Sequence, residues 1–198
     1  MSPAAPPSAE KPWRLFVAAD VPQDHLQWVR DKSGPLRSSL PAARWTEPGA
    51  QHVTLKFLGA TPVELVDSVI GAIAPAASGR WPAPVSLTEL GAFPSRRRAR
   101  VLWMGLEDPS DLLTGLAADF DHRLRPLGYE PEKRAFTPHL TLARFKSPSP
   151  LPEDATLVAD ELQPFTVDRV TLWRSRLHPS GARYEVVRSF ELKSATSA

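Results

Sequence analysis

The sequence of 198 residues contains no cysteine, which excludes disulfide bonds, thiolate zinc sites and cysteine nucleophiles together. No stretch approaches the roughly 20 consecutive apolar residues that a membrane-spanning helix needs. The first residues, MSPAAPPSAEKP, have neither a basic start nor an apolar run, so no secretory signal is expected. These absences predict a soluble protein of the cytoplasm that does not contact a membrane.

Net charge is also small. The 24 basic and 22 acidic residues nearly cancel, so any affinity for nucleic acid must come from local placement of charge. The strongest local basic segment is SRRRAR, from Ser95 to Arg100. In a loop, Arg96, Arg97 and Arg98 either contact RNA phosphates or form a solvated run of charge.

Histidine is scarce, yet two of the five histidines occur in almost the same tetrapeptide. HVTL occupies residues 52–55 and HLTL occupies residues 139–142. In a strand, residues two apart point the same way, so each histidine shares a face with the threonine that follows it. The same alternation places Lys56 on the face of His52.

The segments that precede the two motifs also match. Each runs from a strand through an acidic residue and a Pro-led helix to the motif strand, and 37 residues separate Leu15 from His52 while 38 separate Val101 from His139. This internal repeat predicts two similar lobes, each presenting one motif strand to a shared central cleft. Residues 1–11, rich in Pro, Ala and Ser, are expected to be a disordered lead-in to a single domain over 12–193.

Hydrophobic periodicity and turn residues predict the remaining elements. Thr61 is expected to cap a helix that Pro62 opens, Asp108 to cap a second helix, and Gly128 to end it. The expected helices are 22–32, 62–73 and 109–127. The expected strands are 15–19, 51–58, 84–90, 99–106 and 137–145. A loop is expected at 146–154, and a hairpin that turns at HPSGA is expected within 167–192.

Two imidazoles in one cleft form an acid–base pair, because imidazole titrates near neutral pH. The hydroxyls of Thr54 and Thr141 can donate to anionic oxygens, and Lys56 or Arg144 can offset phosphate charge. This set suits metal-free displacement at a phosphodiester, and a cyclic phosphate best of all. No carboxylate lies close to either motif in sequence, so neither a metal nor another cofactor is expected.

Other histidines and aromatic residues have simpler interpretations. His25, His122 and His178 are expected to be solvated, and Trp103 to lie in the core. Three aromatic residues near the motifs either pack in the core or stack on a base, namely Trp45, Phe93 and Phe136.

Several segments together resemble the RNA 2′,3′-cyclic phosphodiesterases: the paired HVTL and HLTL, the opening RLFVAADVP, GAF before a basic loop, and FTPHLTLAR. These enzymes, also called 2′-5′ RNA ligases, belong to the 2H phosphoesterase superfamily, and the resemblance covers about residues 13–192. It implies an α+β fold of two pseudo-symmetric lobes of antiparallel sheet, with outer helices around a V-shaped cleft. It also implies metal-independent hydrolysis of a 2′,3′-cyclic phosphate to a 2′-phosphate.

Carried over by position, the resemblance makes His52 the general acid to the leaving O3′ and His139 the general base on water. Thr54 and Thr141 would hold phosphate oxygens, and Arg144, five residues after the second histidine, would contact the phosphate. Simple alternation places Arg144 on the opposite face, so a bulge, a strong twist or a strand end near Ala143 is required to bring it round. The two motifs are otherwise nearly symmetric, and only the resemblance tells acid from base.

The expected partners are RNA with 2′,3′-cyclic phosphate ends or cyclic nucleotides, bound by a monomer. Two alternatives stay open. The same site could join RNA ends reversibly through 2′-5′ linkages or act on another cyclic phosphate, or the cleft could bind RNA ends without catalysis.

Overall fold

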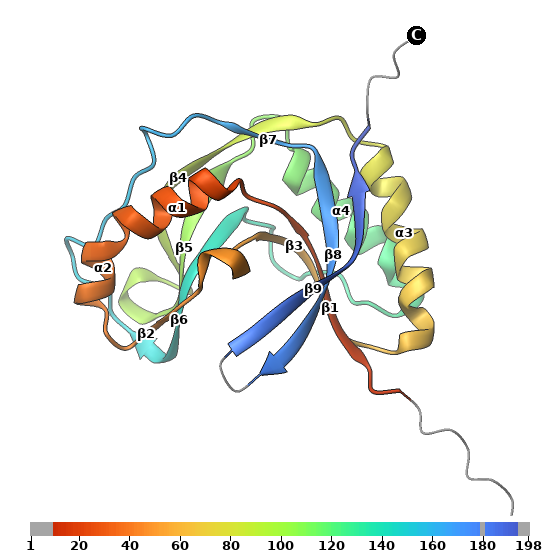
Figure 1. The fold of residues 1–198 in the computed structure, drawn as a ribbon, viewed down its shortest axis with the longest axis horizontal. Coiled ribbons are helices and arrows are strands. Elements are labelled where there is room, and N and C mark those ends of the chain that lie inside the picture. The colour runs from red at the N-terminus through yellow and green to blue at the C-terminus, as the bar shows by residue number, and fades with distance from the viewer. Residues whose placement is uncertain (1–9, 179–180, 194–198) are drawn as a thin grey trace, which may run out of the picture.

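A computed structural model describes residues 10–178 and 181–193 of the chain (Figure 1). Residues 1–9 of the predicted lead-in, and part of the predicted HPSGA turn, lie outside the described residues. No helix in the described part of the chain is long and apolar enough to cross a membrane.

Two antiparallel sheets form the two lobes, which confirms the α+β prediction. Their strand orders are β3-β1-β8-β9 and β2-β6-β5-β4-β7, here called the first and the second sheet. The orders correspond, with β3 matching β6, β1 matching β5, β8 matching β4 and β9 matching β7, as the repeat predicts. The strands are β1 Trp13–Ala19, β2 Ala43–Trp45, β3 Val53–Thr61, β4 Ala83–Phe93, β5 Ala99–Glu107, β6 His139–Ser149, β7 Phe165–Val167, β8 Arg169–His178 and β9 Gly181–Glu191.

Three of the four α-helices of the described residues cover the sheet of the other lobe (Figure 1). Helices α1 (Gln23–Lys32) and α2 (Gly34–Ser39) follow β1 of the first sheet but lie over the second. Helix α4 (Leu112–Leu124) follows β5 of the second sheet but packs on β3, beside α3 (Val66–Ser78), which contacts β9. Each half of the repeat therefore covers the sheet of the other half.

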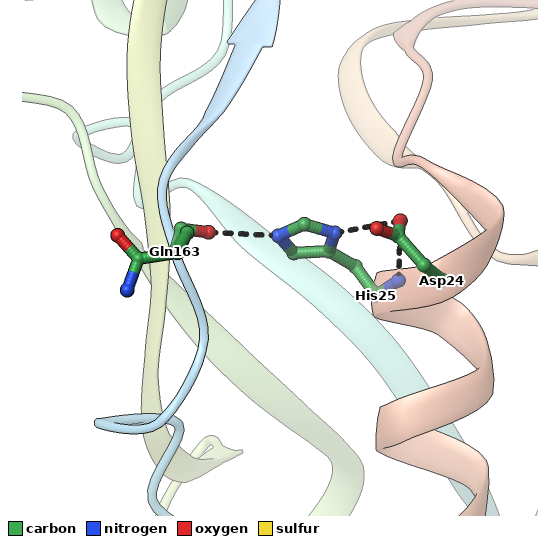
Figure 2. Close-up of polar contacts among 3 residues, drawn as sticks. All are labelled: Asp24, His25 and Gln163. Atoms are coloured by element: carbon green, nitrogen blue, oxygen red, sulfur yellow. Dashed lines mark hydrogen bonds and ion pairs between the residues drawn. The ribbon is translucent and has the colours of Figure 1, made fainter.

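His25 ties α1 to its sheet, and the expectation that it is solvated is wrong. Only 7% of the residue is exposed, and its two ring nitrogens lie 2.9 Å from Asp24 Oδ1 and 2.9 Å from the carbonyl oxygen of Gln163 (Figure 2). Its ring also meets the edge of Phe165 in β7, with centroids 5.0 Å apart. His122, by contrast, is exposed as expected, and nothing is described of the side chain of His178.

Two of the predicted helix starts are displaced. Thr61 is the last residue of β3 rather than a helix cap, and its buried hydroxyl accepts a hydrogen bond from Tyr129 at 3.0 Å. A short 3₁₀ turn, Val63–Leu65, precedes α3. The N-cap of α4 is Asp111 rather than Asp108, and the helix begins at Leu112; Asp108 still supports this end, since its Oδ1 accepts from the backbone N–H of Leu112 at 2.9 Å.

Other boundaries also differ from the prediction. Gly128 ends the helical segment with a positive φ of 89°, as predicted. The expected loop at 146–154 is wrong over its first part, because β6 continues to Ser149. The short elements α2, β2 and β7 were not predicted, and β2 proves important because it lies beside β6.

Candidate active site

A cleft with two chambers lies where β3 and β6, the motif strands, come together between the sheets. One chamber, of about 740 Å³, is lined by His139 and Thr141; the other, of about 510 Å³, is lined by His52. Thr54, Phe57 and Arg144 line both chambers, so these three side chains stand at the junction. The structure thus brings both motifs to one site.

Strand β3 carries a bulge directly after its motif. Consecutive residues Val17 and Ala18 of β1 pair with Lys56 and Thr54, which leaves Leu55 as the extra residue. Directly opposite residues share a face of the sheet. Lys56 therefore shares the helix-covered face with Val17.

Lys56 is a correction to the predicted phosphate-binding set. Its side chain is 2% exposed, forms an ion pair with Asp121 of α4, and donates to the carbonyl oxygen of Glu130 at 2.7 Å. It lines neither chamber. The predicted alternation fails because one extra residue inverts the face of every later residue in the strand.

Phe57 takes the place that alternation assigned to Lys56. It pairs with Phe16 across β1, is 46% exposed, and lies under the guanidinium of Arg14, which is 4.9 Å from the ring centroid. Sequence reasoning missed this residue. The sequence did hold a signal for it: Phe57 stands five residues after His52, just as Arg144 stands five residues after His139.

Strand β6 carries the matching bulge. Consecutive residues Leu102 and Trp103 of β5 pair with Ala143 and Thr141, so Leu142 is the extra residue. Leu142 stands three residues after His139, just as Leu55 stands three after His52. The bulge rotates Arg144 onto the face of His139 and Thr141, and Arg144 lines both chambers. Of the bulge, strong twist or strand end expected near Ala143, the structure shows the bulge.

His52 is held between two aromatic rings. The backbone of Ala50, two residues earlier, partly opposes the effect of burial on the pKa of the imidazole. Phe16 stacks on the ring, with centroids 4.6 Å apart and an interplanar angle of 22°, and Tyr184 of β9 meets it edge-on at 5.3 Å. These contacts fix the plane of the imidazole.

His139 has equivalent support on the other side of the cleft. Its Nδ1 donates to the carbonyl oxygen of Thr137 at 2.8 Å, which leaves Nε2 of the neutral ring free to accept a proton. Phe93 meets the ring edge-on at 5.1 Å, and Trp103 lies at 6.1 Å. Trp103 can lie flat on β4 only because Gly91 has no side chain: a Cβ there would stand 2.1 Å from the indole.

Burial and positive charge both act on the two imidazoles. Burial lowers the pKa of His52 to about 4, with a smaller contribution from the charge of Arg144. Burial also lowers the pKa of His139, and Arg144 adds to this effect. Both rings are therefore neutral in the empty cleft at pH 7, and a bound anion that offsets Arg144 would raise both pKa values.

The remaining predicted residues separate into three groups. Phe136 and Phe93 line the His139 chamber, where a base could stack. The guanidinium of Arg96 donates to the carbonyl oxygen of Ala155, although the residue is exposed, and its contact with RNA stays a prediction. The neighbouring side chains of Arg97 and Arg98 are exposed.

Two tryptophans complete this set. Trp45 packs against the core, and Arg37 covers its ring at 4.6 Å, so it does not line either chamber. Trp103, expected in the core, is only half-buried and supports His139 instead.

Comparison with known proteins identifies the family. The model of the 2′-5′ RNA ligase superfamily matches residues 22–179. The chain is 31% identical to the RNA 2′,3′-cyclic phosphodiesterase of Methanothermobacter thermautotrophicus over 186 residues, covering 90% of this chain and 98% of that protein. It is also 31% identical to the protein of the same name from Archaeoglobus fulgidus, covering 90% and 99%.

A solved structure agrees with the sequence relatives. The crystal structure of a protein from Thermus thermophilus superposes with a TM-score of 0.73 at 28% identity, covering 92% of this chain and 99% of that one. The chain belongs to the 2′-5′ RNA ligase superfamily, which confirms the resemblance carried by the two motifs.

Proposed function

We propose that this enzyme hydrolyses 2′,3′-cyclic phosphate ends of RNA or nucleotides to 2′-phosphates without a metal ion, using His52 and His139 as acid and base. The observation that carries the proposal is the symmetric presentation of two imidazoles to one cleft, with Thr54 and Arg144 between them. The names of the relatives support the same substrate class.

In the proposed step, Nε2 of His139 takes a proton from water as the water oxygen attacks phosphorus. The P–O3′ bond breaks, and His52 gives its proton to O3′, so the product carries a free 3′-hydroxyl and a 2′-phosphate. Arg144 offsets the charge that develops on the phosphoryl oxygens, and the hydroxyls of Thr54 and Thr141 donate to them. Lys56 has no part in this step, because it lies on the opposite face of β3.

The electrostatics of the cleft make the protonation of His52 depend on substrate. With its pKa near 4 in the empty cleft, His52 is a poor proton donor at pH 7. A phosphodiester beside Arg144 offsets the guanidinium charge and stabilises the imidazolium, so the pKa of His52 is expected to rise on binding. The pH optimum of kcat, which reports the enzyme–substrate complex, should therefore lie above that of kcat/KM.

The direct test is turnover of a nucleoside 2′,3′-cyclic phosphate in EDTA, with the position of the product phosphate resolved by ³¹P NMR. Wild type is compared with His52→Ala and His139→Ala, and each loss should reach at least about 10²-fold for a missing acid or base. Turnover that EDTA abolishes, or that survives both substitutions, contradicts the mechanism. Salt-dependent binding of RNA ends without turnover would favour a binding module instead.

The size of the His139 chamber favours one additional activity. Water attacks from the His139 side in the proposed step, and that side offers about 740 Å³ with Phe93 and Phe136 on its wall. A nucleoside held there could place its 5′-hydroxyl where the water would stand, which yields a 2′-5′ linkage. Incubating cyclic-phosphate and 5′-hydroxyl oligonucleotides together, and probing the joint with nucleases, tests this joining reaction.

A further inference from the structure

Beyond the cleft, the second sheet presents a row of cations on its open face. Arg44 of β2 lies directly opposite Arg144 of β6, so the two side chains share a face. Lys146 follows Arg144 by two residues, with the buried Phe145 between them, and its side chain is exposed like that of Arg144. We call Arg44, Arg144 and Lys146 the basic row.

The basic row has no acidic partner of its own. All three side chains are exposed, and none of them takes part in the ion pairs found among the described residues. Like charges directly opposite on neighbouring strands destabilise a sheet. A polyanion laid over the row would supply the missing negative charge.

The row is also continuous with the site. Arg144, its central member, lines both chambers of the cleft, whereas Arg44 and Lys146 line neither. At its outer end, a guanidinium nitrogen of Arg100 lies 3.5 Å from the carbonyl oxygen of Lys146, so the start of β5 runs alongside. The exposed Arg97 and Arg98 stand just before this strand.

The spacing fits a chain of charges rather than a single ion. Arg44 and Arg144 are one strand apart, about 4.8 Å, and Lys146 is two residues further along β6, which is at most about 7 Å. A lone phosphate in the cleft would reach Arg144 but leave the two flanking cations unused. A ligand with successive phosphates would use all three.

We propose that the basic row binds the backbone phosphates of a single-stranded RNA whose cyclic end occupies the cleft, an inference that rests on the proposed function. Arg44 and Lys146 are then residues that favour oligonucleotides over mononucleotides, while chemistry stays with the two histidines. Arg96, which is bonded to Ala155, is outside this surface.

The test compares a nucleoside 2′,3′-cyclic phosphate with a pentaribonucleotide that ends in the same cyclic group. In Arg44→Gln/Lys146→Gln, kcat/KM for the pentamer should fall roughly tenfold, while that for the mononucleotide changes less than about twofold. The control is Arg125→Gln, which removes one exposed charge from the turn after α4, the helix that packs on β3 of the first sheet, and should leave both values unchanged. Because Arg44→Gln removes a like-charge contact, the thermal midpoint should stay the same or rise, which separates lost binding from lost folding.

Fluorescence anisotropy of a pentamer with a 3′-phosphate end measures binding independently of turnover. The slope of log K against log salt should shrink by about 1.4 in the double variant, since each phosphate contact on a single strand contributes about 0.7. No change in slope, equal losses for both substrates, or equal competition by polyglutamate would overturn the proposal. If neither substrate is turned over but binding of the pentamer still depends on the basic row, the proposed function is refuted and the proposed RNA-binding surface is not.

Discussion

Replacing Lys56 separates its structural role from the phosphate-binding role that alternation alone suggests. Its ammonium group lies in the interior, between the carboxylate of Asp121 on α4 and the carbonyl of Glu130. In Lys56→Met the apolar stem keeps its volume, but the carboxylate loses its cation and the carbonyl loses its donor. The pair joins β3 to the helix that covers it.

The magnitude follows from the burial of both partners. Removing one partner of a buried ion pair costs about 3–5 kcal/mol, because the other charge is left uncompensated. The Asp121 side chain is 22% exposed, so water can partly solvate its carboxylate, and we expect the lower figure, roughly 3 kcal/mol. Lys56→Met/Asp121→Asn should recover part of this loss, since no unpaired charge remains.

Urea denaturation at pH 7 measures the change in unfolding free energy, with Lys32→Met as the matched control. Lys32 forms an exposed pair with Glu161, so its loss should cost less than about 1 kcal/mol. At a temperature where Lys56→Met is fully folded, kcat/KM should stay within about threefold of wild type. Unchanged stability with a hundredfold loss of kcat/KM would refute the structural role that the bulge gives Lys56, and would show that Lys56 contacts the substrate.

Three further predictions concern the cleft. Burial lowers the pKa of His52 to about 4 from 6.5, so between these pH values the unfolded chain binds more protons than the folded one. The free energy of unfolding should therefore fall by up to roughly 3 kcal/mol as the pH drops through this window. In urea titrations, His52→Gln should flatten this dependence of the unfolding free energy on pH. Identical slopes in the two proteins would contradict it. Phe57→Ala should raise KM for a cyclic nucleotide roughly tenfold, the value of one stacked base, with kcat and thermal midpoint little changed; a change confined to kcat would argue against stacking. Gly91→Ala must displace the Trp103 ring beside His139, so kcat should fall by roughly ten- to a hundredfold, whereas Gly71→Ala, with open space around its Cβ, should be silent. A Gly91→Ala enzyme of normal kcat would show that Trp103 does not position the histidine.

The strand carrying each motif could be predicted from the sequence because alternation is local, and the internal repeat was sufficient to pair the two lobes. Alternation fails beyond Leu55 and Leu142, since a bulge depends on the partner strand and leaves no local signature in composition. Arg144 and Lys56 show the same effect with opposite outcomes. Simple alternation places Arg144 away from the cleft, which it lines as the family resemblance implied, and places Lys56 in the cleft, although it lies in the interior.

His25 and the crossing helices escaped prediction for a different reason. The apolar stripe of α1 indicates that one face of the helix packs against a sheet, but it does not indicate which of the two similar sheets. Only contacts between distant segments, such as His25 with Gln163, decide this. The short β2 is likewise specified by its pairing with β6 rather than by its three residues.

The crossed helices have a consequence for how the chain is made. During synthesis, α1 and α2 emerge long before most of the sheet that they cover, and the first sheet lacks β8 and β9 until residue 191 has been added. The second sheet has all its strands once Val167 has been added, whereas the first sheet, with α3 and α4 already made, must wait for β8 and β9. The chain must postpone its final packing until translation is almost finished, and the two lobes are expected to gain and lose their structure as a single cooperative unit.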